Sequence, residues 1–238
     1  MTKFNLEKYT LQELKNICKK LFLIPRKTKS ECIKDITINL EKYEKNKDKY
    51  KKGEKIGFGK EGTTYIVTDK KGKEYAMKTF KKTKSSKKIM NEISLQKKVQ
   101  SKKICPKIID YNLDEKYIVM EKMDSHLLDI INKVGLNKTR QLRLLYIFQV
   151  LDNEGVFHDD ANLSNYMIKD DEIYIIDFGY AKPIDEKLIK KLATDKPNYT
   201  LMTIGFILKL KEYKIPKSSY RYLINSIDEK LRKLYNLE

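Results

Sequence analysis

The sequence has little of the chemistry that builds disulfide-bonded, zinc-binding or membrane-spanning proteins. It contains no tryptophan, and its three cysteines, Cys18, Cys32 and Cys105, form no C-x-x-C pair and have no histidine nearby. These features exclude a disulfide framework and a typical zinc site. No apolar run approaches the length of a membrane span, and the first ten residues lack the apolar centre of a signal peptide. We therefore expect a soluble protein, with no membrane partner, in a reducing intracellular compartment.

Charge is strongly unbalanced. Lys and Arg total 51 against 33 Asp and Glu, a formal net charge of +18. Such an excess favours polyanionic partners such as nucleic acid, anionic membrane or acidic protein. An AT-rich coding sequence would also enrich lysine, asparagine, isoleucine and tyrosine, and the two explanations have equal weight. With 40% apolar residues in 238, the chain can bury a real core.

Residues 1–52 are predicted to form a separate helical module. They carry 15 Lys/Arg and 7 Asp/Glu, nearly half of the net charge. Thr10 and Thr28 each precede a glutamate by three residues, which is the capping-box signature of a helix start. Apolar residues share one face of each helix: Leu11, Leu14, Ile17, Cys18 and Leu21 in the first, and Cys32, Ile33, Ile36 and Leu40 in the second.

Residues 8–40 resemble the SAP-type module, two helices joined by an extended loop, through this apolar spacing and the connector "IPRKTKSE". The resemblance implies contacts with nucleic-acid phosphates from Lys19, Lys20, Arg26, Lys27 and Lys29. A helical hairpin that only braces the next domain fits the same residues equally well. The following "EKYEKNKDKYKKG" is interpreted as a charged helix tail and linker, with strands from Lys55 onward.

Three glycines, Gly57, Gly59 and Gly62, lie in a G-x-G-x-x-G pattern that runs into the strand-like "TTYIVT". A dinucleotide-binding loop would continue into a helix, and a Walker loop would need G-K-[ST]. We therefore predict a loop that joins two strands, lies flat over phosphates and offers backbone N–H groups to them. A second hairpin is expected, with 63–68 and 73–80 flanking the turn "DKKG".

Lys78 is predicted inside a strand among apolar neighbours, where a lysine is costly unless an anion meets it. The next segment, "SSKKIMNEISLQKKV", has helical spacing, with Ile89 and Ile93 inside and Glu92 at the border of that face. Glu92 can therefore reach Lys78. Without the rest of the chain, the preferred interpretation of these two residues is an exposed edge-strand lysine and a solvent-facing glutamate.

A second polar cluster surrounds the hairpin "NYMIKDDEIYIID". If Tyr166 lies opposite Ile176, then Asn165 lies opposite Asp177, and their oxygens suit Mg²⁺. Asp160 can face the reacting group as a base or a hydroxyl-orienting group. Asp170, Asp171 and Glu172 are assigned to a solvated turn, and Asp159 is left without a role. His158 is interpreted as a structural residue that holds the backbone.

The ordered set of the three glycines, Ala76, Lys78, Glu92, "HDDANLSN" and "DFG" resembles the protein-kinase superfamily over about residues 53–180. The resemblance implies that Lys78 and Glu92 orient the phosphates of ATP, that Asp160 is the catalytic aspartate, and that Asn165 and Asp177 hold Mg²⁺. Met120 has the gatekeeper place. The implied nucleotide-binding set is Ile56, Gly57, Phe58, Gly59, Gly62, Ala76, Lys78, Met120, Glu121 and Met123.

Departures from the family pattern indicate a reduced protein. Asp159 replaces the arginine of H-R-D, which argues against control by a phosphorylated activation loop. Thr200 stands where the long central helix usually starts with aspartate, and only 59 residues follow Gly179. The short C-terminal half is similar to small atypical kinases such as the RIO type and the KEOPS kinase subunit, and the lysine-rich texture to kinases of large DNA viruses. A viral source would imply host cytoplasm or virion, and otherwise we expect cytoplasm or nucleus.

We thus predict an α+β, bilobal protein-kinase-like fold with a reduced C-terminal lobe. The helical module occupies 1–52, and the kinase-like domain occupies 53–238, with lobes at about 53–122 and 123–238. The predicted function is a Ser/Thr protein kinase that uses ATP and Mg²⁺, with an unknown protein substrate and nucleic acid as a candidate partner of 1–52. The alternatives are an ATPase or a phosphotransferase for another acceptor, and a non-catalytic module tethered to nucleic acid.

Overall fold

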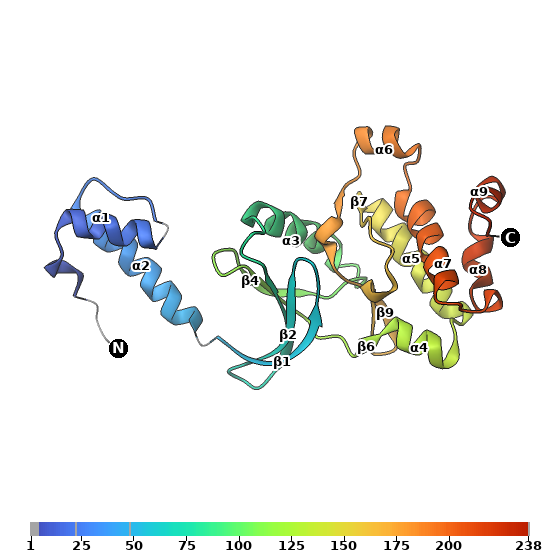
Figure 1. The fold of residues 1–238 in the computed structure, drawn as a ribbon, viewed down its shortest axis with the longest axis horizontal. Helices are drawn as coiled ribbons and strands as arrows, with labels where there is room; N and C mark the ends of the chain where they lie inside the picture. Colours follow the sequence, from blue (N-terminus) through green and yellow to red (C-terminus); the bar gives the residue numbers. More distant parts are fainter. Residues whose placement is uncertain (1–4, 22, 48, 238) are drawn as a thin grey trace. The chain divides into compact units, whose positions relative to one another are not determined.

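A computed structural model describes residues 5–21, 23–47 and 49–237 (Figure 1). The chain divides into two compact units, one of residues 1–52 with 67–73 and the other of 53–66 with 74–238. Within the described ranges, no helix combines the length and apolar character needed to cross a membrane.

The N-terminal unit contains two α-helices among its described residues, α1 (Leu11–Lys20) and α2 (Lys29–Lys47). The Thr10 hydroxyl accepts from the Glu13 amide at 3.3 Å, and the Glu13 carboxylate accepts from the Thr10 amide at 2.7 Å. Thr28 and Glu31 exchange the same pair of bonds at 3.3 and 3.2 Å. Both predicted capping boxes are therefore present, and each satisfies backbone N–H groups that a helix start leaves unpaired.

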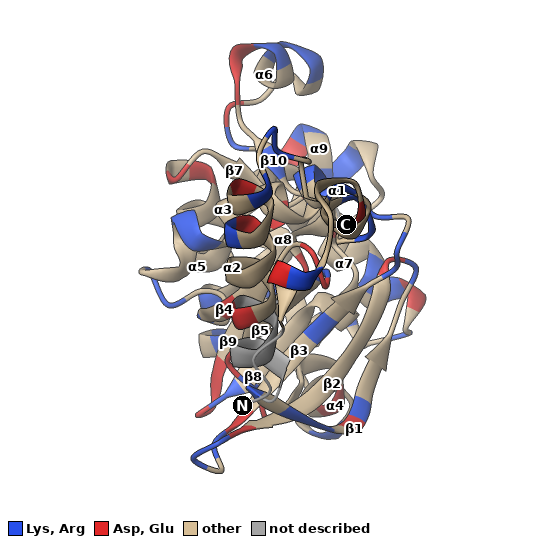
Figure 2. Ribbon diagram, turned by 90° about the vertical axis from the view of Figure 1, so that its left-hand side faces the viewer, with Lys and Arg blue, Asp and Glu red and all other residues tan. Residues whose placement is uncertain are grey.

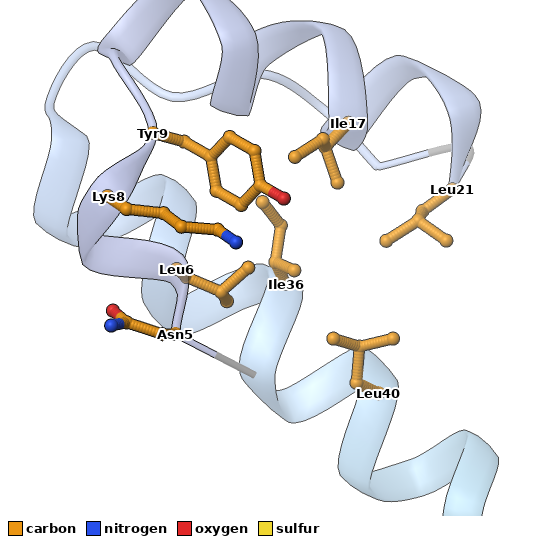
Figure 3. A pocket seen from close by; sticks show the side chains of 8 residues that line it. All are labelled: Asn5, Leu6, Lys8, Tyr9, Ile17, Leu21, Ile36 and Leu40. Carbon is orange, nitrogen blue, oxygen red and sulfur yellow. The ribbon is translucent and has the colours of Figure 1, made fainter. Parts of the chain in front are cut away.

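The two helices pack through the predicted apolar faces. Leu14, Cys18, Cys32 and Ile36 are fully buried, and Leu11, Ile17, Leu21, Ile33 and Leu40 pack around them. A small apolar pocket opens beside this core (Figure 3); its lining is Asn5, Leu6, Lys8, Tyr9, Ile17, Leu21, Ile36 and Leu40.

The predicted charged helix tail is present, but the strands begin earlier than predicted. Helix α2 continues to Lys47, and strand β1 begins at Tyr50, so residues 50–53 of the predicted linker lie in a strand. Glu and Lys, which dominate this stretch, are strong helix formers. The charged tail therefore extends the helix.

A five-stranded sheet, in the order β1-β2-β3-β5-β4, carries the glycine-rich and lysine-bearing segments. Its strands are β1 (Tyr50–Phe58), β2 (Gly62–Asp69), β3 (Glu74–Phe80), β4 (Ile108–Asn112) and β5 (Tyr117–Met120). Strand β5 is antiparallel to both β3 and β4. The predicted strand–loop–strand around the glycines and the hairpin at 63–80 are confirmed.

Helix α3 (Ser86–Gln100) lies beside the sheet (Figure 1). Ile89 and Ile93 point inward, as predicted, into a cluster with Phe80, Ile108 and Ile118. Glu92 is buried with them at the border of this face. The helix thereby holds a carboxylate against strand β3.

The remaining chain is mainly helical and surrounds a second, larger apolar core. Its helices are α4 (Leu127–Val134), α5 (Lys138–Asn153), α6 (Glu186–Leu192), α7 (Thr203–Glu212), α8 (Arg221–Asn225) and α9 (Glu229–Leu234). Its short strands are β6 (Ser125–His126), β7 (Val156–Phe157), β8 (Tyr166–Lys169), β9 (Glu172–Ile175) and β10 (Lys182–Pro183). Figure 2 shows both charge signs on α6, whose first turn is acidic and last turn basic. The mixed helix and sheet content, with an antiparallel sheet first, is the predicted α+β class.

The β8–β9 hairpin corrects the predicted register by one residue. Tyr166 lies opposite Ile175, not Ile176, and Lys169 lies opposite Glu172. The turn therefore has two central residues, Asp170 and Asp171, both at positive φ. Two left-handed residues fit the tight turns that match strand twist, and aspartate tolerates this conformation.

The apolar spacing from Ser219 onward fits one amphipathic helix, but the structure has two short helices there, α8 and α9. Asp228 caps the start of α9 and accepts from the Lys230 amide at 2.9 Å. Leu223 and Ile227 are buried, but Leu234 is 71% exposed. Helix α7 begins at Thr203, after a π-helical turn at Asn198–Met202 that contains Thr200.

Candidate active site

The glycine-rich loop is a tight connection between β1 and β2. The Gly59 amide donates to the Gly62 carbonyl at 2.9 Å, which closes the tip. A Cβ on Gly62 would lie 2.1 Å from the Thr79 carbonyl oxygen, so the close approach of β3 requires glycine there. Ile56 and Phe58, on β1 before this tip, are 43% and 75% exposed.

Lys78 on β3 joins two carboxylates. Its Nζ lies 2.6 Å from Glu92 Oε1 and 2.6 Å from Asp177 Oδ1. The Lys78 side chain is 12% exposed and that of Glu92 only 4%. Burial alone would lower the pKa of Lys78, but the charges of Glu92 and Asp177 outweigh it and raise that pKa above its ordinary value. Lys78 is therefore a fixed cation.

Asp177 follows β9 in a left-handed backbone conformation, with φ +64°. Its Oδ1 also accepts from the Gly179 amide at 3.2 Å. Burial alone would raise the pKa of Asp177, but the charge and hydrogen bond of Lys78 lower it below its ordinary value. Asp177 is thus held as a carboxylate at neutral pH.

Asp160 and Asn165 lie in the loop between β7 and β8. Asp160 Oδ1 accepts from the Asn162 amide at 3.1 Å, and the Asn162 side chain accepts from the Ser164 amide at 3.1 Å. Asn165 is 7% exposed, and its carbonyl accepts from the Ile176 amide at 2.8 Å. That bond brings the backbone before β8 next to the backbone just before Asp177.

Asp159, which the sequence left without a role, forms an ion pair. Its Oδ2 lies 2.6 Å from Lys182 Nζ, and its backbone is left-handed with φ +60°. Lys182 belongs to β10, which pairs with β7 directly before the loop. The ion pair therefore ties the loop between β7 and β8 to the segment that follows Gly179.

His158 is a structural residue, as interpreted from the sequence. It is fully buried, and its Nε2 lies 3.0 Å from the Ile176 carbonyl oxygen. Its ring packs edge-on against Phe178. Burial lowers the pKa of His158 below its ordinary value, although Asp160 and Asp177 oppose the shift.

Asn198 is a key residue that the sequence reasoning missed. It is fully buried, its Oδ1 accepts from the His158 amide at 3.0 Å, and its Nδ2 donates to the Val156 carbonyl at 2.8 Å. Its backbone and side-chain N–H groups both donate to Asp152 on α5, at 2.9 and 2.7 Å. The loop is therefore anchored by a residue whose partners are more than 39 positions away in sequence, with no local pattern to reveal it.

The residues expected around adenine lie at the end of β5 and next to it. Ala76 on β3 is opposite Met120 on β5, and Met123 is 7% exposed. The Glu121 amide donates to the Lys107 carbonyl at 2.9 Å, and the Glu121 carboxylate pairs with Lys169. The Glu121 N–H and side chain are thus already used within the protein.

The donor set suits few-ligand magnesium binding better than a dedicated metal cage. Among residues 5–21, 23–47 and 49–237, no group of three His, Cys, Asp or Glu side chains could hold a metal ion. Asp177 offers a carboxylate, and Asn165 can offer an amide oxygen. Mg²⁺ favours such a site, since it keeps several waters and takes few protein oxygens.

Residues 50–200 match the model of the protein kinase domain family. The chain belongs to this family. Curated similar proteins include the serine/threonine-protein kinase dkf-1 of Caenorhabditis elegans, 27% identical over 164 residues, or 60% of this chain and 23% of that protein. Another is the probable serine/threonine-protein kinase YbdM of Bacillus subtilis, 27% identical over 161 residues, or 62% of this chain and 63% of that protein.

A viral protein is also similar. The putative serine/threonine-protein kinase L232 of Acanthamoeba polyphaga mimivirus is 35% identical over 83 residues, 31% of this chain and 13% of that protein. The chain spans less than a quarter of the nematode relatives' length. The activities and substrates of those whole proteins are therefore attributed to this chain only as proposals.

Proposed function

We propose that the chain is an ATP-dependent protein kinase that transfers the γ-phosphoryl group to serine or threonine. The observation that carries the proposal is Lys78, which lies 2.6 Å from both Glu92 and Asp177 although these residues come from three separate elements. A buried ammonium fixed in this way can bind a phosphate without reorganising, and preorganised charge is what phosphoryl transfer needs.

Each residue of the site takes a specific task in this proposal. The glycine-rich loop covers the phosphates, Lys78 binds them, and Glu92 keeps Lys78 in place. Asp160 orients the acceptor hydroxyl. The adenine would lie among Ile56, Phe58, Ala76, Met120, Glu121 and Met123, and the carbonyl of Glu121 and the backbone of Met123 would be its polar contacts.

Asn165 and Asp177 would hold Mg²⁺ in the loaded enzyme, where the ion supplies neutralising charge at the phosphates. Asp177 is prepared for this task because its pKa is already lowered by Lys78. Asn165 is held by its backbone bond to Ile176.

The Ser/Thr acceptor is supported by the names of the three similar proteins described above, each of which is called a serine/threonine-protein kinase. In this chain, Asn162 stands where the protein-Ser/Thr loop commonly has lysine. Its side chain caps the Ser164 amide instead. A different acceptor, or plain ATP hydrolysis, is therefore the alternative to be tested.

The test is transfer of labelled γ-phosphate from ATP and Mg²⁺ to the protein itself and to generic basic and acidic proteins. We expect label with wild type and at least a hundredfold less with Asp177→Asn. Asp171→Asn is the matched control, because Asp171 lies in the β8–β9 turn, is 84% exposed at its side chain and has a conformation that asparagine tolerates.

Three results would change the conclusion. ATP consumption that needs Asp177 but labels no protein would indicate another acceptor or an ATPase. Equal labelling by wild type and Asp177→Asn would reject the assigned site. If ATP neither binds nor turns over, the chain is a binding module.

We also propose that residues 1–52 bind nucleic acid through phosphate contacts. Arg26 pairs with Asp35 at 2.6 Å and Lys29 donates to the Glu7 carbonyl at 2.6 Å, so two of the five expected contacts are used internally. Lys19, Lys20 and Lys27 are exposed, with no ion pair to another described residue. We place the protein in a reducing intracellular compartment, which suits its three buried free cysteines.

A further inference from the structure

Lys84 is a second buried lysine at the candidate active site. It lies between β3 and α3, and its side chain is only 6% exposed. Its Nζ lies 2.7 Å from Glu92 Oε2, pairs with the Glu61 carboxylate and stands 4.4 Å from the centre of the Phe80 ring. A buried ammonium is costly unless it is paired, so this position is built for charge.

Lys84 completes a line of five alternating charges, Glu61, Lys84, Glu92, Lys78 and Asp177, here named the five-charge chain. Glu92 is its centre, because Oε1 binds Lys78 and Oε2 binds Lys84. The five-charge chain runs from the glycine-rich loop through α3 and β3 to Asp177, which follows β9. Each carboxylate is therefore oriented by a lysine.

The two ends of the five-charge chain come close together at Gly179. A Cβ placed on Gly179 would lie 2.8 Å from Glu61 Oε2 and 3.0 Å from Asp177 Oδ1. The glycine-rich loop thus contacts the segment after Asp177 through the side chain of Glu61. The Lys81 amide adds a backbone bond to the Glu61 carbonyl at 2.9 Å.

Removing Lys84 would leave three carboxylates around one ammonium. Glu92 would lose the partner of one oxygen, and Glu61 would face the charges of Glu92 and Asp177 without compensation. Glu61 is the member best able to move, since its side chain is 32% exposed. Its departure would release the glycine-rich loop.

We propose that Lys84 is a positioning residue that fixes Glu92 from the side opposite Lys78 and holds the glycine-rich loop closed through Glu61. Its effect on catalysis rests on the proposed kinase function. Its effect on the loop does not, because the ion pairs join side chains of this chain alone.

The first experiment measures amide hydrogen exchange of the full chain without nucleotide. Wild type is compared with Lys84→Met, Glu61→Gln and the control Lys87→Met, an exposed lysine in the first turn of α3. We expect exchange at Gly59 and Lys81 to be about tenfold faster in the first two variants and unchanged in the control. Unchanged exchange at both amides in Glu61→Gln would overturn the proposal, even if Lys84→Met fails to fold.

The second experiment separates positioning from general damage. We expect Glu61→Gln to raise KM for ATP about tenfold with little change in kcat, and Lys84→Met to change both by about tenfold. The double variant should be no worse than Lys84→Met alone, because Glu61 contributes only through its ion pair with Lys84. Additive losses in the double variant would overturn the proposal. If wild type binds no fluorescent ADP and transfers no phosphate, the kinase function fails, while the exchange result still decides the role of Lys84.

Discussion

His158 shows how the burial of one side chain sets a pH limit on the fold. Its Nε2 faces the Ile176 carbonyl, and its Nδ1 is buried without a partner among the described residues. A second proton on the ring would therefore have no acceptor, which agrees with the lowered pKa of His158.

Stability should consequently fall as the pH drops below 6.5, the ordinary pKa of the group. The unfolded chain takes up the proton first, so each pH unit between the unfolded and folded pKa values costs up to about 1.4 kcal/mol. His158→Gln keeps a donor and cannot titrate. Urea unfolding at pH 7.5 and 5.5 should show a smaller pH loss in the variant than in wild type; equal losses would assign the acid sensitivity to other groups.

Asn198 connects two secondary-structure elements and the loop between β7 and β8. It joins α5 through Asp152, β7 through Val156 and the loop through His158. All these groups are partly or fully buried, so each hydrogen bond satisfies a polar group that water does not reach.

Asn198→Ala should therefore leave buried polar groups unpaired and cost about 2–4 kcal/mol of unfolding free energy. Displacement of the loop should also lower kcat about 10- to 100-fold. Asn153→Ala is the control, because Asn153 is exposed on α5 and should change stability by less than about 0.5 kcal/mol. Denaturant unfolding and the label-transfer assay measure both effects. A loss of stability with unchanged kcat would show that the loop does not depend on this anchor.

Local patterns predicted the elements whose causes are local. The helix starts at Thr10 and Thr28 follow from residues three positions apart, and the strand after Gly62 follows from its own composition. The β8–β9 register was wrong because it depends on Asp170 and Asp171 both adopting positive φ, which side-chain type permits but does not require. The break before α9 could not be read from apolar spacing, because that spacing continues across it.

The site residues also divide into those with a local sequence signal and those without one. Lys78 and Glu92 could be paired from the sequence, since one is in a strand and the other on the border of the next helix. Lys84 gave no signal, because its partner Glu61 is 23 residues away and the lysine-rich segment hides it. Only the folded arrangement distinguishes Lys84 from its exposed neighbours.

Charge is distributed unequally between the two parts of the molecule. Residues 1–52 hold +8 of the +18 net charge, and α1 and α2 within this range pack as a helical pair with its own apolar core. Lys19 and Lys20 end α1, and Lys27 precedes α2. These three exposed lysines are not part of the apolar core, so they can be substituted without disturbing the packing of the two helices.

Because these lysines lie outside the apolar core, reversing their charge tests DNA binding without a change in packing. Duplex DNA binding by the full chain should weaken with salt, and Lys19→Glu, Lys20→Glu and Lys27→Glu together should reduce the slope of log K against log salt by about 1 per lost phosphate contact. The matched control changes three exposed lysines of α6, Lys187, Lys190 and Lys191, to glutamate, which alters net charge equally. Equal slopes for the two triple variants would mean that only the overall charge attracts DNA, and the helical pair would then have no specific nucleic-acid role. A slope reduced only in the first variant would locate phosphate contacts in residues 1–52.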